Sequence, residues 1–147
     1  MPPSPRHLFV YGSLLSGARH AMGARLRAAA ALAGAAAMPG RLYDLGAYPG
    51  AVHDSDARGI VVGELWALRR PGLLLRQLDL YEGCAPGQPE PHAFRREVAG
   101  VVLMGNRALP AWVYLWTGGP AGRRPVAGGD WLVHVSARTA RPARAHI

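Results

Sequence analysis

The sequence predicts a single α+β domain in which a curled or closed β-sheet carries flanking helices, and three observations lead to this prediction. Short runs rich in β-branched and aromatic residues, each bounded by glycine or proline, predict five or six strands. Only two stretches have the composition or the apolar spacing of helices. The length of 147 residues fits one domain with a core of its own.

The predicted strands are separated by turn-forming segments. The first, "LFVY" at residues 8–11, is a short apolar run that ends at Gly12. The run "GIVVGELWAL" at 59–68 is bounded by glycine, which predicts a strand buried on at least one face. The turn-rich segments 47–58 and 118–129 are predicted to be loops. Further strands are predicted at 40–46, 94–103 and 109–116.

Two helices and the limits of the domain complete the predicted organisation. Residues 18–33, "ARHAMGARLRAAAALA", have high helix propensity because alanine and arginine dominate them. Residues 71–83, "PGLLLRQLDLYEG", open with proline and close with glycine, as helices commonly do. The domain is expected to span residues 7–135. An N-terminal extension precedes it at 1–6, and an Arg/Pro-rich tail at 136–147 is expected to be disordered.

The charge of the chain raises the question of a nucleic-acid partner. The net charge is +8, and all 17 basic residues are arginine. These arginines are dispersed or lie in the tail, and no recognition motif accompanies them, so no specific nucleic-acid partner is expected. A basic accessory protein that binds polyanions stays open as an alternative. An anionic substrate explains the charge equally well.

Cysteine and histidine usage indicates the compartment and the kind of site. The one cysteine, Cys84, excludes an intramolecular disulfide and fits a reducing compartment. The start "MPPSPRH" has no hydrophobic leader and the alanine-rich stretch is too short to span a membrane, so a cytoplasmic protein without a membrane partner is expected. No pair among the six histidines has metal-ligand spacing, so neither a metal nor another cofactor is expected.

Glu82 is placed unfavourably for the stability of its helix. It directly precedes Gly83, where a carboxylate faces the negative end of the helix dipole, and Asp79 lies one turn back. Leu75, Leu78 and Glu82 are spaced three and then four residues apart, so they share one helix face. If that face packs on the sheet, desolvation, the dipole and an ionised Asp79 would raise the Glu82 pKa, as a general base at neutral pH requires. The alternative is that Glu82 frays into solvent.

The turn after the first strand, "YGSL" at residues 11–14, is a second candidate. Gly12 lets the backbone turn sharply, which directs the N–H groups of Ser13 and Leu14 above the strand end. Consecutive N–H groups of this kind form an anion-binding nest without any basic side chain. Strands commonly end at glycine without a function, so a purely structural turn is the alternative. Ser13 is not expected to be a nucleophile, because no Gly-x-Ser-x-Gly elbow surrounds it and no base is assigned to it.

The order of these fragments carries a resemblance to a known family. Between residues 7 and 131 the chain contains, in this order, "FVYGSL", "GRLYDLGAYPG", "GELW", "LDLYEG", "FRREV", "AWVYLW" and "GDW". In this order and spacing it resembles the gamma-glutamylcyclotransferase-like family, in its AIG2-like branch. The resemblance implies the gamma-glutamylcyclotransferase-like fold, a small mixed β-barrel with flanking helices.

The resemblance also implies an activity and a site. Enzymes of the family convert a gamma-glutamyl amide into 5-oxoproline and release a free amine, without a metal or covalent intermediate. A single glutamate does the proton chemistry, and on this chain that residue is Glu82. The loop that holds the substrate corresponds to Tyr11, Gly12, Ser13 and Leu14. A binding or sensing module that keeps this pocket without turnover is the alternative function.

The remaining matches concern the wall of the pocket and the frame of the fold. Tyr48 resembles part of the family's pocket wall and is a candidate substrate-binding residue, although an ordinary core position fits it equally well. Five matched residues are expected to be structural: Phe94, Arg95, Trp112, Asp130 and Trp131.

Overall fold

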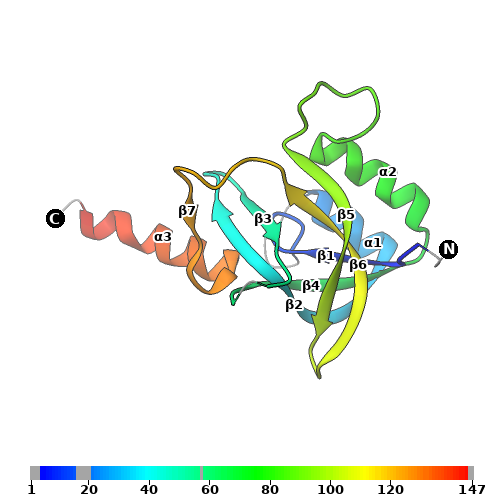
Figure 1. The fold of residues 1–147 in the computed structure, drawn as a ribbon, viewed down its shortest axis with the longest axis horizontal. Helices are drawn as coiled ribbons and strands as arrows, with labels where there is room; N and C mark the ends of the chain where they lie inside the picture. The colour runs from blue at the N-terminus through cyan, green and yellow to red at the C-terminus, as the bar shows by residue number, and fades with distance from the viewer. Residues whose placement is uncertain (1–3, 16–20, 57, 146–147) are drawn as a thin grey trace.

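The computed structural model of the chain describes residues 4–15, 21–56 and 58–145. Its centre is a closed barrel of five strands in the order β2, β4, β1, β6 and β5, which β5 closes by pairing with β2 (Figure 1). The β1–β6 pair is parallel and the other pairs are antiparallel, so the predicted mixed β-barrel is confirmed. The strands are β1 (His7–Val10), β2 (Ala30–Asp44), β4 (Ile60–Leu68), β5 (Phe94–Leu103) and β6 (Arg107–Trp116).

The prediction of a helix over residues 18–33 is only partly correct. Helix α1 covers Ala21–Ala29, and residues 18–20 lie outside the described part of the chain. From Ala30 to Pro39 the chain instead pairs antiparallel with β4. Helix propensities differ by only a few tenths of a kcal/mol for most residues, so tertiary pairing outweighs them. Small side chains also suit the interior of a narrow barrel, where Ala36 is buried.

The second half of β2 extends beyond the barrel and carries two short strands. Strand β3 (Pro49–His53) pairs antiparallel with residues Gly40–Asp44 of β2. Strand β7 (Arg124–Pro125) pairs with the end of the same strand. Both strands lie in segments that were predicted to be loops. Their glycine- and proline-rich composition indicates a loop, whereas the strands form because they pair with residues distant in the sequence.

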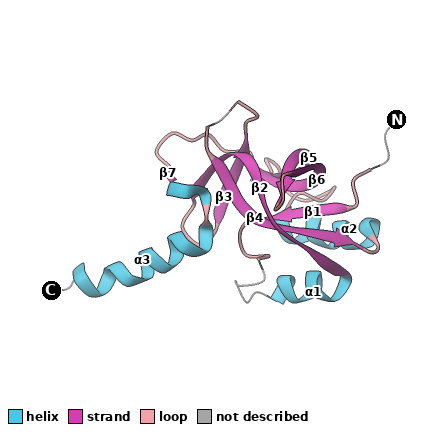
Figure 2. Cartoon of the chain, turned by 90° about the horizontal axis from the view of Figure 1, so that it is seen from below, coloured by secondary structure: helices cyan, strands magenta, loops and turns pink. Residues whose placement is uncertain are grey.

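Helices α1 and α2 (Pro71–Glu82) pack together on one side of the barrel (Figure 2). The predicted limits of α2 are confirmed, since it begins at Pro71 and is capped by Gly83 in the left-handed conformation, with φ of 78°. Leu74, Leu75 and Leu78 are buried in a cluster of apolar side chains between the helices and the outside of the barrel. A second cluster fills the barrel. Leu75 and Leu78, which share a helix face with Glu82, therefore pack on the sheet, and this is the condition under which Glu82 was expected to face inward.

The expectation of a disordered tail from residue 136 is wrong for most of that segment. Helix α3 (Trp131–Ala145) follows the short 3-10 turn η2 (Ala127–Gly129) and projects away from the barrel (Figure 1). Alanine and arginine have high helix propensity, and the start of α3 is anchored by tertiary contacts. His134 Nε2 lies 2.8 Å from Asp44 Oδ2, and Arg138 Nη1 donates a hydrogen bond of 3.0 Å to the same oxygen.

Among the helices of the described residues, none has the length and apolar character needed to cross a membrane.

Candidate active site

A cavity of about 450 Å³ lies where the end of β1 meets the last turn of α2. All six residues that the sequence singled out line this one cavity: Tyr11, Gly12, Ser13, Leu14, Tyr48 and Glu82. They come from the strand-end loop, from the turn before β3 and from the last residue of α2. The remaining lining residues are Phe9, Val10, Ala47, Pro49, Tyr81, Phe94 and Tyr114.

Glu82 lies in this cavity as a partly buried carboxyl group. Burial raises its pKa from the ordinary value of 4.5 to about 7. No group in the described part of the chain donates a hydrogen bond to it or forms an ion pair with it. The expected repulsion from Asp79 is not a cause of the shift, because Asp79 points to Arg96 and pairs with it at 2.8 Å. The alternative that Glu82 frays into solvent is therefore excluded in this structure.

The strand-end loop is a tight turn that offers main-chain donors. The N–H of Leu15 donates a hydrogen bond of 3.0 Å to the carbonyl oxygen of Gly12, which closes the turn. The N–H groups of Ser13 and Leu14 have no acceptor among the described residues. Both residues line the cavity, and consecutive N–H groups without an internal acceptor are typical of a site that binds an anionic group.

Tyr11 contributes to the site through its ring and backbone, because its hydroxyl group is used within the protein. The hydroxyl donates a hydrogen bond to the carbonyl oxygen of Tyr114 and accepts one of 3.3 Å from the N–H of Ala51. Burial raises the Tyr11 pKa strongly, and the charge of Glu82 raises it further. The phenol is therefore neutral, and the electrostatic effect shows that Glu82 lies close to the start of the loop.

Tyr81 and Tyr114 are cavity residues that the sequence analysis missed. The hydroxyl groups of Ser13 and Tyr81 lie 2.9 Å apart and share a hydrogen bond, which joins the loop to the last turn of α2. Tyr81 directly precedes Glu82, so its position in "LDLYEG" was visible, but its orientation depends on how α2 packs. The position of Tyr114 follows from the closure of the barrel, for which no local signal exists.

Tyr48 and Phe94 form one wall of the cavity. Tyr48 is 46% exposed, so it lies at the rim and is not an ordinary core residue. Its ring centroid is 5.8 Å from that of Phe94, with the planes tilted by 55°. Phe94, expected to be structural, therefore also faces the candidate site.

Among the described residues, no three histidine, cysteine, aspartate or glutamate side chains are arranged to hold a metal ion.

The family of the chain follows from its sequence. A family model described as gamma-glutamyl cyclotransferase, AIG2-like, matches residues 8–133. The chain therefore belongs to this family, and the resemblance found in the sequence is confirmed. No curated protein matches the chain in sequence.

Solved structures show the same fold. YkqA from Bacillus subtilis superposes with a TM-score of 0.69 at 20% identity, over 92% of this chain and 42% of that one. This chain thus spans less than half the length of YkqA. An AIG2-like protein from Mus musculus has a TM-score of 0.62 at 23% identity, with 78% and 80% of the two chains covered. The protein ytfP from Escherichia coli has a TM-score of 0.58 at 29% identity, with 86% and 96% covered.

Proposed function

We propose that the protein cyclises a gamma-glutamyl amide to 5-oxoproline with release of a free amine, and that Glu82 is the general base and general acid. One observation carries this proposal. A partly buried carboxyl group without a hydrogen-bond or ion-pair partner among the described residues shares a cavity with Ser13 and Leu14, whose N–H groups have no acceptor among those residues. A buried anion is costly unless a cation pairs with it, and the α-ammonium of a glutamyl group is such a cation.

The cavity suits the charges and the size of this substrate class. Its volume lies within the usual range of small-molecule sites. The N–H groups of the loop donate hydrogen bonds to a carboxylate or a developing oxyanion, while the carboxylate of Glu82 accepts hydrogen bonds from the ammonium group. Ring closure requires the glutamyl chain to fold back on itself, and an enclosed pocket that holds both ends supplies this orientation. The wall formed by Tyr48 and Phe94 limits the space for the rest of the substrate.

One proton transfer precedes the attack of the amine and another precedes the departure of the leaving amine, and one carboxyl group performs both. In the first step, ionised Glu82 takes a proton from the α-ammonium, and the freed amine attacks the γ-carbonyl carbon to form the new C–N bond of the ring. The carbonyl oxygen becomes an oxyanion, which donors such as the loop N–H groups stabilise by about 2.7–4 kcal/mol each in related chemistry. In the second step, protonated Glu82 gives its proton to the nitrogen of the leaving amine. The original C–N bond then breaks as the oxyanion becomes the ring carbonyl, and the positively charged ring nitrogen loses its extra proton to the released amine, so that 5-oxoproline and an ammonium ion leave the site.

The pKa of Glu82 suits both transfers. A group whose pKa is about 7 exchanges its proton readily near neutral pH, so it can act as base and then as acid within one turnover. An unshifted glutamate would be ionised and too weak a base to deprotonate an ammonium group efficiently.

The experiment that tests this function is incubation of the protein with a panel of gamma-glutamyl amides, including gamma-glutamyl dipeptides and gamma-glutamyl-lysine. The expected result is release of 5-oxoproline and free amine in equal amounts from at least one member. Saturable binding without release would replace the proposal with a binding or sensing module. Binding only to polyanions, persisting at high salt, would favour a basic accessory protein instead.

A further inference from the structure

We propose that Asp79, Arg96 and Tyr114 form a positioning unit that fixes Glu82 at a set place relative to the substrate-binding loop. The inference rests on the proposed function for its catalytic readout. The carboxyl group of Glu82 has no hydrogen bond to any of the described residues, so its position depends on the residues that hold the end of α2.

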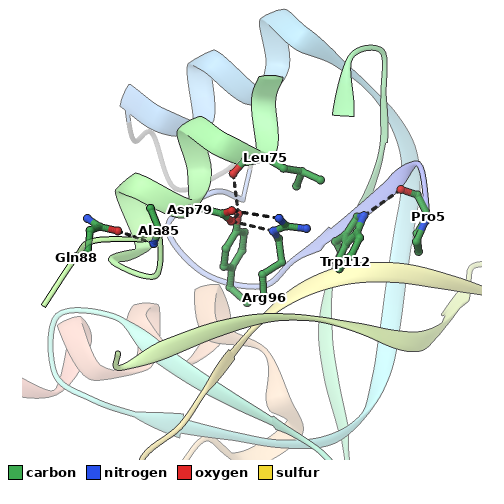
Figure 3. A network of polar contacts seen from close by, with 8 residues as sticks. Pro5, Leu75, Asp79, Ala85, Gln88, Arg96 and Trp112 are labelled. Atoms are coloured by element: carbon green, nitrogen blue, oxygen red, sulfur yellow. Dashed lines mark hydrogen bonds and ion pairs between the residues drawn. The ribbon is translucent and has the colours of Figure 1, made fainter. Parts of the chain in front are cut away.

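Asp79 lies one turn before Glu82 and ties α2 to β5 through Arg96 (Figure 3). Arg96 Nε donates a hydrogen bond of 2.8 Å to Asp79 Oδ1, and Arg96 Nη2 donates one of 3.1 Å to Oδ2. The two side chains are only 24% and 14% exposed. A bidentate, shielded pair of this kind fixes geometry far better than a single surface contact.

Arg96 is itself held from the other side. Its guanidinium group lies over the ring of Trp112, 4.4 Å from the centroid. The indole N–H of Trp112 donates a hydrogen bond of 3.0 Å to the carbonyl oxygen of Pro5. The pair is therefore anchored on β6 and on the segment that enters β1, both of which belong to the rigid barrel.

Tyr114 extends the contact to the substrate-binding loop. Its hydroxyl donates a hydrogen bond of 2.7 Å to Asp79 Oδ1, and its backbone carbonyl accepts one from the hydroxyl of Tyr11. Tyr11 is the first residue of the loop. A continuous series of hydrogen bonds therefore runs from the helix that carries Glu82 to the loop that carries the N–H donors.

The backbone on both sides of Glu82 is also held by hydrogen bonds. The carbonyl oxygen of Asp79 accepts a hydrogen bond of 2.9 Å from the N–H of Cys84. Gln88 Nε2 donates one of 3.1 Å to the carbonyl oxygen of Leu80. Asp79 thus holds the last turn through its main chain and fixes that turn to the barrel through its side chain. Without the side-chain anchor, a turn that ends at a left-handed glycine and carries an unfavourable carboxylate is expected to open.

Tyr114→Phe is the main test, because it removes one hydroxyl group without changing the charge of the site. We expect kcat to fall about 10- to 100-fold with KM changed less than about 3-fold, since a displaced catalytic group lowers the rate more than it lowers binding. We also expect the Glu82 pKa to move from about 7 towards 4.5, because an opened turn admits water. NMR titration of side-chain-labelled glutamate follows this pKa, and the chain has only four glutamates to assign.

Arg96→Met and Arg95→Met form a matched pair of variants on one strand. Arg95 is 65% exposed and pairs with exposed Glu97, so its replacement is expected to leave kcat within about twofold. Replacement of Arg96 is expected to lower kcat at least tenfold. Arg96→Lys keeps the positive charge but cannot form the two parallel hydrogen bonds to Asp79. Its kcat is therefore expected to lie between those of the wild type and Arg96→Met.

The outcomes separate positioning from mere stability. A folded Tyr114→Phe protein that keeps both the wild-type kcat and a Glu82 pKa near 7 would overturn the proposal, even if it unfolds at lower temperature. If Tyr114→Phe does not fold, equal kcat values for the Arg96→Lys and wild-type proteins would overturn it. If the wild type releases no 5-oxoproline, the proposed function fails. In that case the Glu82 titration in Tyr114→Phe still decides whether the unit positions the carboxyl group.

Discussion

The ring of Pro49 lies directly against Gly12. A Cβ atom on Gly12 would stand 2.9 Å from Cγ and 3.0 Å from Cδ of that proline. Such distances are shorter than ordinary contacts between carbon atoms, so only glycine fits at this position. Both residues line the cavity, and the shape of the loop at Ser13 therefore depends on a side chain at the start of β3.

Gly12→Ala is expected to displace the loop and impair the site. The added methyl group must push Pro49 or the turn aside, which costs about 1–3 kcal/mol of stability, and misplaced donors should lower kcat/KM about 10- to 100-fold. Urea unfolding and 5-oxoproline release measure the two effects. Gly119→Ala is the control, because nothing lies within 4 Å of its Cβ position. Unchanged kinetics for Gly12→Ala would show that the turn tolerates movement without loss of function.

Glu82→Gln is expected to keep the fold and to lower kcat about 10²- to 10⁴-fold, because the amide cannot accept and return a proton. The side chains have the same size, so circular dichroism and size-exclusion behaviour should match the wild type. Glu97→Gln, at an exposed carboxylate of β5 paired with Arg95, serves as the control and should be near normal. Turnover within a few-fold of wild type in Glu82→Gln would remove this residue from the mechanism.

The rate should depend on pH through Glu82. In the proposed mechanism the free enzyme needs the ionised carboxylate of Glu82 to take the proton from the substrate, and the pKa of that group is about 7. We therefore expect kcat/KM to rise with pH through a limb centred near 7, whereas an unshifted glutamate would place that limb near 4.5. Initial rates of 5-oxoproline release between pH 5 and pH 9 measure the profile. Residual activity of Glu82→Gln should lack this limb, and a limb near 4.5 in the wild type would contradict the burial of the group.

Titration of Glu82 should also make the free energy of unfolding depend on pH, in the opposite direction to the rate. The folded protein binds the Glu82 proton more tightly than the unfolded chain does, so this contribution is present below pH 4.5 and is lost as pH rises through 7. Glu82→Gln carries no charge to bury and should be more stable than wild type by about 1–3 kcal/mol at pH 8. The difference should be smallest near pH 4. Denaturant unfolding at the two pH values measures it, and a gap that does not vary with pH would exclude the titration of Glu82 as its cause.

The parts of the fold that local signals determine were predictable. Helix α2 begins at a proline and ends at a left-handed glycine, and the spacing of Leu75, Leu78 and Glu82 placed the glutamate on the same helix face as two leucines that are buried. By contrast, the alanines after Ala29 have the propensity of a helix and form a strand only because β4 lies beside them. Helix α3 was missed because its anchor, Asp44, is far away in the sequence.

In the candidate site, too, only the residues marked by local sequence motifs were predictable. The loop and Glu82 are marked by short motifs, but their wall is completed by Phe94 and Tyr114, which the barrel brings in from β5 and β6. Asp79 shows most clearly what the sequence alone could not predict. Along the sequence it is a like charge one turn from Glu82, whereas in the structure Arg96 neutralises it. A pairing between residues on different elements has no signature in either segment.

The position of β1 between β4 and β6 has a consequence for biosynthesis. Leu8 is paired with Trp66 on one side and with Trp112 on the other. Strand β1 is translated before its partner β6 and must wait for it before the ring can close, and contacts so distant along the chain slow folding. Until then the apolar strand "LFVY" of the nascent chain has an unpaired edge, and unpaired strand edges are prone to pairing with other chains.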